Sequence, residues 1–139
     1  MQHHRNHPLL QSMTEIEIKS IKGIEIIREY DQGELVIQTN QRNRDLICIN
    51  QGKVSIQVED TGGSIHEIAQ IEAGNMIGDM NFVIPTRRTA DVVALTRVEA
   101  SIFPYQALTE LLRQNPTLAA KVFSALNVQL ARKYMAMLE

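Results

Sequence analysis

The residue types with the most chemistry to offer lie close together, in the stretch 77–92. Asp79 follows a glycine there, and Arg88 and Thr89 come further along the same stretch. An arginine beside a hydroxyl and backbone N–H groups suits a phosphate, because its guanidinium presents a fork of donors and keeps its charge. A carboxylate accepts hydrogen bonds from sugar hydroxyls, as an acidic residue does for ribose in dinucleotide sites. The stretch therefore predicts a small anionic ligand with hydroxyl groups, and a ribose phosphate is the simplest that fits.

Two local elements must position these groups. The apolar residues around Asp79 predict a short turn or helix that carries its carboxylate. Pro85 then opens a loop that presents Arg87, Arg88 and Thr89 before the chain becomes apolar again.

Length and composition limit what surrounds this stretch. A chain of 139 residues is long enough for one hydrophobic core, and its 44% hydrophobic and 22% charged residues are typical of a soluble globular protein. A net charge of −2 argues against a general nucleic-acid binder, and 4% aromatic residues leave little to stack on bases. The sequence shows neither a membrane-spanning run nor a signal peptide, so a cytoplasmic location is expected. Cys48 lies in an apolar run and is expected to be an inert, buried thiol.

Short β-rich stretches separated by turn residues make up most of the chain. The expected strands cover residues 24–30, 34–38, 46–50, 53–59 and 64–71, and a final pair of strands is expected over 90–103. Clean alternation in the fourth stretch predicts that Val54, Ile56 and Val58 face inward. Many short strands with regular turns predict a mainly β, antiparallel sandwich or barrel.

Helices are expected at both ends. Thr14 and Glu17 have the spacing of a capping box, which predicts a helix over 15–20 that ends at Gly23. Two further helices are expected over 105–114 and 117–138. The last carries an apolar stripe that either packs on the strands or forms a two-chain helical seam. The stripe consists of Ala119, Phe123, Leu126, Leu130 and Met137.

The stretch 77–92 resembles the phosphate-binding cassette of cyclic nucleotide-binding domains, such as those of catabolite activator proteins and protein kinase A regulatory subunits. Gly78 and Asp79 align with the glycine and the ribose-binding glutamate of that pattern, and Arg88 aligns with its phosphate-binding arginine. There are departures: Asp79 is one methylene shorter than glutamate, Asn81 stands where a small residue is usual, and Arg87 replaces a common proline. The resemblance extends over roughly residues 9–130.

The resemblance implies an antiparallel jelly-roll-like β-roll with a short N-terminal helix and two C-terminal helices. The whole chain, 1–139, would form a single domain of this kind. Residues 1–23 would be a tail and helix, 24–103 the roll with its cassette at 77–92, and 104–139 the C-terminal helices.

The same resemblance implies a ligand, cAMP or cGMP, and no cofactor, metal or enzymatic activity. The implied ligand-binding residues are Gly78, Asp79, Met80, Asn81, Arg87, Arg88, Thr89 and Ala90. A threonine beside the arginine is frequent in members that prefer cGMP, although it also occurs in bacterial cAMP receptors. Leu130, Tyr134 and Leu138 of the last helix are candidates for a lid over the base.

The implied role is regulatory signal transduction, in which ligand binding shifts the position of the C-terminal helices. The implied partners are a second copy bound through the last helix, an effector protein or a fused domain. Members that bind DNA continue into a helix-turn-helix after the long helix, whereas this sequence stops at Glu139, so no DNA-binding element is expected. The chain either stands alone or is one piece of a larger protein.

Two other functions stay open. The departures at Asp79 and Asn81 favour a related scaffold that binds no nucleotide and mediates protein interaction or dimerisation. A metal-dependent enzyme on a similar roll would need two or three histidines and an acid, yet only His66 lies within the expected strands. The spacing of His3, His4 and His7 fits no structural metal site. For Arg88, the alternative to ligand binding is a structural salt bridge with Asp79 or Asp91.

Overall fold

The structure, a computed structural model, describes residues 9–138. His3, His4 and His7 therefore lie outside the described residues. The helices are α2 (Glu15–Lys22), α3 (Asp79–Val83), α4 (Tyr105–Gln114) and α5 (Pro116–Met137). The strands are β1 (Ile26–Tyr30), β2 (Leu35–Ile37), β3 (Leu46–Gln51), β4 (Lys53–Glu59), β5 (Ile65–Glu72), β6 (Met76–Ile77), β7 (Asp91–Ala94) and β8 (Val98–Phe103).

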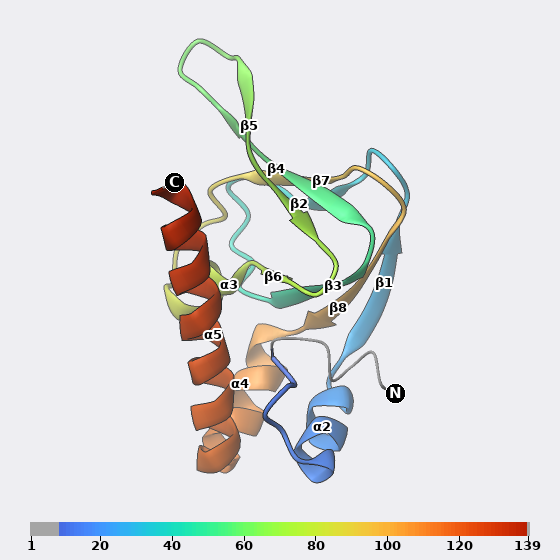
Figure 1. The fold of residues 1–139 in the computed structure, drawn as a ribbon, viewed down its shortest axis with the longest axis vertical. Helices are drawn as coiled ribbons and strands as arrows, with labels where there is room; N and C mark the ends of the chain where they lie inside the picture. The colour runs from blue at the N-terminus through green and yellow to red at the C-terminus, as the bar shows by residue number, and fades with distance from the viewer. Residues whose placement is uncertain (1–8, 139) are drawn as a thin grey trace.

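Two four-stranded antiparallel sheets form the roll, which confirms the predicted fold class (Figure 1). One sheet has the order β1-β8-β3-β6 and the other β2-β7-β4-β5. Apolar side chains from both sheets, among them Ile49, Val54 and Val98, form the core between them. The β4–β5 hairpin projects beyond the body of the roll (Figure 1). Val54 is buried as predicted and Ile56 packs against the core, but Val58 is only half-buried and lies outside the core cluster, because the hairpin has left the roll at that point.

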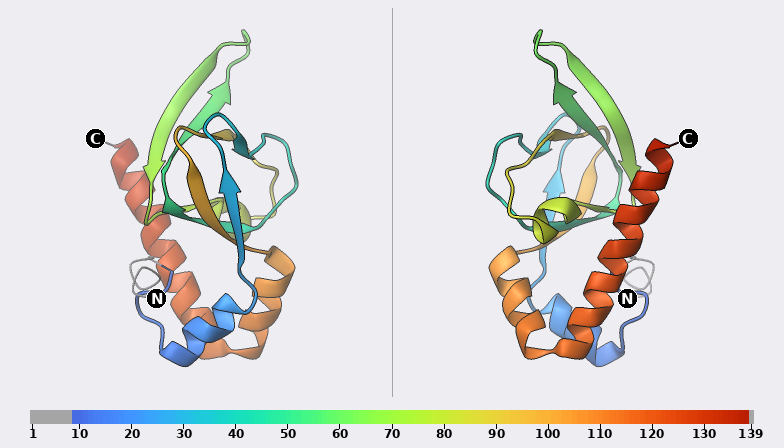
Figure 2. Two further views of the ribbon diagram at one scale, coloured as in Figure 1. Left: turned by 90° about the vertical axis from the view of Figure 1, so that its right-hand side faces the viewer. Right: turned by 90° about the vertical axis from the view of Figure 1, so that its left-hand side faces the viewer.

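Helices α2 and α4 and the first part of α5 gather at one end of the roll around a second apolar core, and α5 then continues along the side of the roll (Figure 2). The predicted capping box is present in α2: Thr14 Oγ1 accepts from the Glu17 N–H at 3.2 Å, and Glu17 Oε1 accepts from the Thr14 N–H at 2.9 Å. The helix runs to Lys22, two residues further than predicted, and ends at Gly23. Gly23 has φ −63°, so this helix ends without the left-handed residue that often follows a helix.

Helix α5 contacts the rest of the molecule through a face that differs from the predicted stripe. Its buried residues are Leu118, Val122, Leu126 and Gln129. Of the predicted stripe, Leu126 is buried and Ala119 is partly buried, whereas Phe123 and Met137 are exposed. The prediction failed for two reasons. Apolar residues lie side by side along this helix, as at Val122 and Phe123, so the pattern does not select one face, and the buried face ends on a polar residue, Gln129, which an apolar pattern cannot include. Although α5 is long, no helix within residues 9–138 is apolar enough to cross a bilayer.

Strand β6 was not predicted, because two residues are too short for a strand pattern. It pairs with β3, where Ile77 lies opposite Ile47 and Met76 opposite Cys48, and it leads directly into the cassette helix α3. Cys48 is buried, and burial together with the charges of Glu25 and Asp79 raises the pKa of its thiol well above the usual value. A thiol in that state is a poor nucleophile, in agreement with the expectation of an inert cysteine.

The loop between β2 and β3 is fastened to the cassette. Asn40 has φ 73°, the left-handed conformation that its asparagine tolerates. Its N–H donates to the Arg88 carbonyl at 2.8 Å, and the Arg88 N–H donates to the Gln41 carbonyl at 2.8 Å. These two backbone hydrogen bonds hold the main chain of Arg88 in place, independently of the contacts of its side chain.

Candidate functional site

Gly78 joins β6 to α3 and must be a glycine for two reasons. Its φ of +74° lies in the left-handed region, which residues with a Cβ adopt at a cost. A Cβ at this position would also lie 2.6 Å from Arg88 Nη1 and 3.0 Å from the Asp45 carbonyl oxygen. The guanidinium of Arg88 therefore passes directly over the glycine, and the aligned pair of glycine and arginine is a packed unit.

Arg88 is buried, with 3% of its surface exposed, and both terminal nitrogens of its guanidinium meet protein acceptors. Nη1 donates to the Gly78 carbonyl at 3.4 Å and to Asn81 Oδ1 at 3.1 Å. Nη2 donates to Asn43 Oδ1 at 3.0 Å and to the Asp45 carbonyl at 2.9 Å. The buried Nε has no hydrogen-bond partner among the described residues.

All four acceptors around Arg88 are neutral. The alternative of a structural salt bridge with Asp79 or Asp91 is wrong for this arrangement: Asp79 pairs elsewhere, and Asp91 Oδ1 accepts from the N–H and the hydroxyl of Thr39. Burial lowers the pKa of Arg88, and the more distant charges of Asp45 and Asp79 oppose this shift. Arginine nevertheless stays protonated in proteins, so the cassette encloses a cation without a directly bonded anion.

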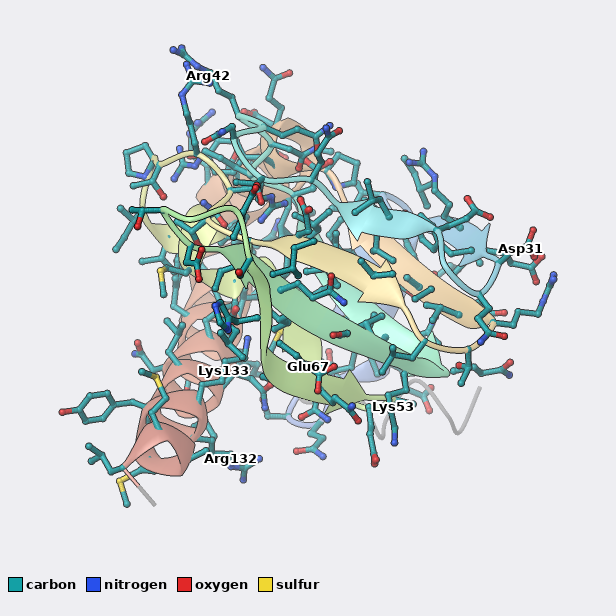
Figure 3. All side chains as sticks on the ribbon, turned by 90° about the horizontal axis from the view of Figure 1, so that it is seen from above. Asp31, Arg42, Lys53, Glu67, Arg132 and Lys133 are labelled. Carbon is teal, nitrogen blue, oxygen red and sulfur yellow. The ribbon has the colours of Figure 1, made fainter. Side chains whose placement is uncertain are left out.

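Asp79, the first residue of α3, is equally buried, with 3% of its surface exposed. Its Oδ1 accepts from Lys133 Nζ on α5 at 2.7 Å, and its Oδ2 has no hydrogen-bond partner among the described residues. Figure 3 shows Lys133 nearer the roll than its neighbour Arg132. A buried carboxylate oxygen without a donor is unusual, and it suits a hydroxyl from a ligand.

Helix α5 is held against β6 by two polar side chains one turn apart. Gln129 Oε1 accepts from the Met76 N–H at 3.4 Å, and Lys133 Nζ donates to the Met76 carbonyl at 3.1 Å. Strand β6 lies at the edge of its sheet, so these side chains satisfy the backbone groups that a further strand would otherwise bind. Sequence analysis missed both residues. The only signal was the interruption of the apolar stripe at Lys133.

A second connection, also missed, runs through the loop before β3. Arg44 donates to the carbonyls of Asn81 and Phe82 at 2.9 Å each and to the Tyr105 hydroxyl at 2.7 Å. Its guanidinium also lies over the Tyr105 ring, 4.0 Å from the centroid. The neighbouring Asp45 accepts from the Tyr105 N–H at 2.7 Å. The loop therefore joins the end of α3 to the start of α4.

Most of the other predicted site residues are exposed. Met80 and Thr89 are exposed, and Ala90 is half-buried. Arg87 is exposed and donates to the Asn40 carbonyl at 3.0 Å, so it braces the loop from outside. The predicted lid residues lie on the last turns of α5: Leu130 is half-buried, while Tyr134 and Leu138 are 62% and 67% exposed.

A small cavity of about 50 Å³ adjoins Arg88. It lies on the side of Asn43 and Asp45 and extends to Tyr30, and Asp79 does not line it. Pockets that hold a small-molecule ligand usually measure several hundred Å³. Arg88 and Asp79 are thus buried within the same cassette, and this small cavity reaches only the first of them.

No group of three or more metal-binding side chains occurs within residues 9–138. His66, the histidine in the strands, is exposed on the projecting hairpin, where its Nε2 lies 2.6 Å from Asp60 Oδ2. This hydrogen bond lowers the pKa of Asp60.

The fold and the cassette agree with the sequence comparisons. The profile of the cyclic nucleotide-binding domain matches residues 27–115, and the chain belongs to that family. Cyclic GMP-binding protein C of Dictyostelium discoideum is 28% identical over 102 residues, which are 73% of this chain and 4% of that protein. Glutaminase 2 of Bradyrhizobium diazoefficiens is 28% identical over 128 residues, 92% of this chain and 20% of that protein. The chain thus spans a small part of both relatives.

Solved structures of low sequence identity share the fold. A cyclic nucleotide-binding domain from Methylobacillus flagellatus has a TM-score of 0.84 at 22% identity, covering 89% of this chain and 70% of that one. The catabolite activator protein of Thermus thermophilus reaches 0.77 at 22% identity, with 94% and 61% covered. The regulatory subunit of a cAMP-independent protein kinase A from Trypanosoma brucei reaches 0.80 at 20% identity, with 99% and 50% covered. The predicted likeness to activator and kinase regulatory domains is confirmed at the level of the fold.

Proposed function

We propose that this chain is a regulatory module that senses a cyclic nucleotide, with the cyclic phosphate at Arg88 and the ribose 2′-hydroxyl at Asp79. The observation that carries the proposal is the pair of buried polar atoms, Arg88 Nε and Asp79 Oδ2, that have no hydrogen-bond partner within residues 9–138. The first is a donor on a cation whose other partners are neutral, and the second is an acceptor on a carboxylate. A ligand with one anionic group and one hydroxyl is complementary to both.

The other cassette residues support these two contacts. Gly78 lets the guanidinium lie against the backbone, and Arg87 adds positive charge near the entrance. Met80, Thr89 and Ala90 border the site and would contact the sugar or base. Thr89 is exposed beside Arg88, where its hydroxyl could bind a guanine, and a relative is named as a cyclic GMP-binding protein. Both cGMP and cAMP remain candidate ligands.

Helix α5 would carry the signal, because both this helix and the ligand would contact Asp79. Lys133 binds one oxygen of Asp79, and the ribose would bind the other. A change in the position of this carboxylate on ligand binding would then alter how α5 is held. Lys133→Met should raise amide exchange in the last turns of α5, whereas Arg132→Met, an exposed neighbour, should not (Figure 3).

The partner would bind the exposed end of α5. Six large apolar residues of this helix and its end are exposed: Phe123, Val128, Tyr134, Met135, Met137 and Leu138. Exposed apolar clusters of this kind often mark interaction surfaces, and a second copy or an effector protein would cover this one. Sedimentation with and without ligand tests the first possibility, since a homodimer would double the mass at micromolar concentration.

One observation favours a second candidate, a scaffold of this family that binds no nucleotide. Asn81 and Lys133 already occupy one donor of Arg88 and one oxygen of Asp79. The kinase regulatory subunit from Trypanosoma brucei is named as part of a cAMP-independent enzyme, so the fold alone does not guarantee cAMP control.

Calorimetric titration with cAMP, cGMP and, as a control, 5′-AMP separates the two candidates. Micromolar or tighter binding of one cyclic nucleotide, about −8 kcal/mol, would support the receptor. The control nucleotide lacks the cyclic phosphate and should bind at least tenfold more weakly. No heat from any of the three, with a protein that unfolds cooperatively, would favour the scaffold.

A further inference from the structure

Asn81 lies inside the cassette, with 8% of its surface exposed, and its carboxamide is fully engaged. Nδ2 faces three acceptors: the Thr86 carbonyl at 3.1 Å, the Thr86 hydroxyl at 3.0 Å and the Arg87 carbonyl at 3.0 Å. Oδ1 accepts from Arg88 Nη1 at 3.1 Å. One side chain thus bonds both to the loop that presents the arginine and to the arginine itself.

The orientation of this carboxamide follows from its neighbours. A carboxamide has a donor end and an acceptor end of nearly the same size and shape, so the surrounding hydrogen-bond network decides which end points where. The reverse orientation would place the NH₂ group against the guanidinium and the oxygen against two carbonyls. The acceptor end of Asn81 therefore points at Arg88, where a ligand anion would also have to bind.

The hydrogen bonds of Arg88 show what an anion would have to displace. Only the Nε N–H is without a partner among the described residues, and a bidentate grip on an anion needs a second donor. Two of the four acceptors are main-chain carbonyls, and Asn43 lies on the side of the small cavity that Asp79 does not line. Asn81 is the side-chain acceptor that shares helix α3 with Asp79, so a ligand that contacts both charged residues meets Asn81 between them.

We propose that Asn81 is an internal occupant of the anion site: its Oδ1 takes the place of a ligand oxygen on Arg88, and its Nδ2 holds the loop 86–88 closed without ligand. The proposal rests on the anion site assigned under the proposed function. The loop 86–88 is then closed with or without a nucleotide, and an incoming anion must displace Oδ1 of Asn81 from Arg88. Asn81 lowers the affinity of the site and makes the loop independent of ligand.

Replacing this side chain should therefore strengthen binding, the opposite of what removal of a ligand contact does. In Asn81→Ala, Arg88 regains a second free donor, and we expect cyclic nucleotide affinity to rise at least about tenfold. The carbonyls that lose their partner belong to exposed residues, Thr86 and Arg87, so water can replace the carboxamide. Val83→Ala is the matched control, because Val83 is an exposed residue at the end of the same helix and takes part in none of the proposed ligand contacts; its affinity should stay within about twofold of the wild type.

The experiment titrates the wild type, Asn81→Ala and Val83→Ala with cAMP and cGMP by calorimetry. It also follows amide exchange of residues 84–90 with and without ligand. We expect faster exchange in free Asn81→Ala, reversed by ligand, and little ligand response in the wild type. If Asn81→Ala does not unfold cooperatively, Asn81→Ser, whose hydroxyl is too short to bridge the loop and Arg88, replaces it under the same criteria.

Each outcome decides between the two proposals. Tighter binding by Asn81→Ala supports the internal occupant. If the wild type binds the nucleotide and Asn81→Ala binds it equally or more weakly, the proposed role of Asn81 as an internal occupant is overturned. The proposed receptor function is then unaffected. Binding by the variant alone supports the occupant and overturns the receptor function of the natural chain. An absence of binding by both proteins overturns both proposals.

Discussion

The two ends of the cassette differ in how their charge is compensated. Arg88 is enclosed by neutral acceptors that come from the cassette and from the loop 43–45. Asp79 instead forms an ion pair with Lys133, which belongs to a helix far along the chain. The cation end is therefore built by the roll itself, whereas the carboxylate end is completed only when α5 is in place.

This difference separates recognition from transmission. A buried cation without a directly bonded anion gains much from a ligand anion. The cation has already lost its water on folding, so only the ligand's charge has still to be desolvated. A carboxylate that already has a lysine partner gains less from a neutral hydroxyl, but any change at it reaches α5 directly. We therefore expect substitutions at Arg88 to change affinity most, and substitutions at Asp79 to change selectivity and the response of the helix.

The largest effect is expected for Arg88→Lys, which keeps the charge but loses the planar fork. Affinity for the cyclic nucleotide should fall on the order of 100-fold, because hydrogen bonds to charged groups each contribute about 1.5–3 kcal/mol. Titration calorimetry measures this, with Arg87→Lys as the exposed control, expected to stay within about threefold of the wild type. Equal losses in the two variants would mean that the buried arginine has no special part in binding.

Gly78→Ala should disturb the positions of both Arg88 and Asp79. The new Cβ would lie 2.6 Å from Arg88 Nη1 on a backbone with φ +74°. Left-handed strain alone costs about 1–3 kcal/mol, so unfolding in urea should show a loss of about 2 kcal/mol or more, together with weaker ligand binding. Gly74→Ala is the control for the strain, since Gly74 has φ +90° and a Cβ added there would meet no atom within 4 Å. A similar stability loss in both variants would show that the contact with Arg88 contributes little.

Asp79→Asn tests whether the carboxylate of Asp79 binds the ribose hydroxyl. It removes the ion pair with Lys133 and weakens the acceptor for a ribose hydroxyl, so affinity should fall about tenfold. The 2′-deoxy form of the same nucleotide should bind the wild type and the variant nearly equally. Asp31→Asn, at an exposed position on another part of the roll, is the control (Figure 3). A full tenfold loss that persists with the deoxy nucleotide would remove the ribose from the role of Asp79.

The smallest effect is expected at the ion pair between Glu17 of α2 and Lys121 of α5, 2.6 Å apart and distant from both ends of the cassette. Its hydrogen bond to Lys121 holds the pKa of Glu17 below the usual value of 4.5. A depressed carboxyl pKa stabilises the fold above the unfolded-state value, and this contribution is lost as pH falls through the folded-state pKa. The midpoint temperature of thermal unfolding of Glu17→Gln should thus equal that of the wild type near pH 3 and be slightly lower than that of the wild type near pH 7. An unchanged difference across this range would contradict the linkage.

Local sequence determined much of the fold. The capping box at Thr14 and Glu17, the prolines at the starts of α4 and α5, and the alternation of the strands each act within a few residues. They could therefore be read in order along the chain. The cassette was equally local: Gly78, Asp79 and Arg88 lie in one stretch, and the structure packs the first against the last. The face of α5 was predicted wrongly, because an apolar pattern does not report a buried polar residue such as Gln129.

Only the tertiary structure decided what surrounds the two charges. No spacing rule connects Lys133 with Asp79, or Arg44 with the start of α4, because these contacts join segments whose positions depend on the packing of the whole roll. The sequence showed that Asn81 stands where the family usually has a small residue, but not which groups its side chain contacts. Its carboxamide could be placed against Arg88 only once α3 and the loop 86–88 were folded together, since hydrogen-bond geometry is set in space and residue type alone leaves it open.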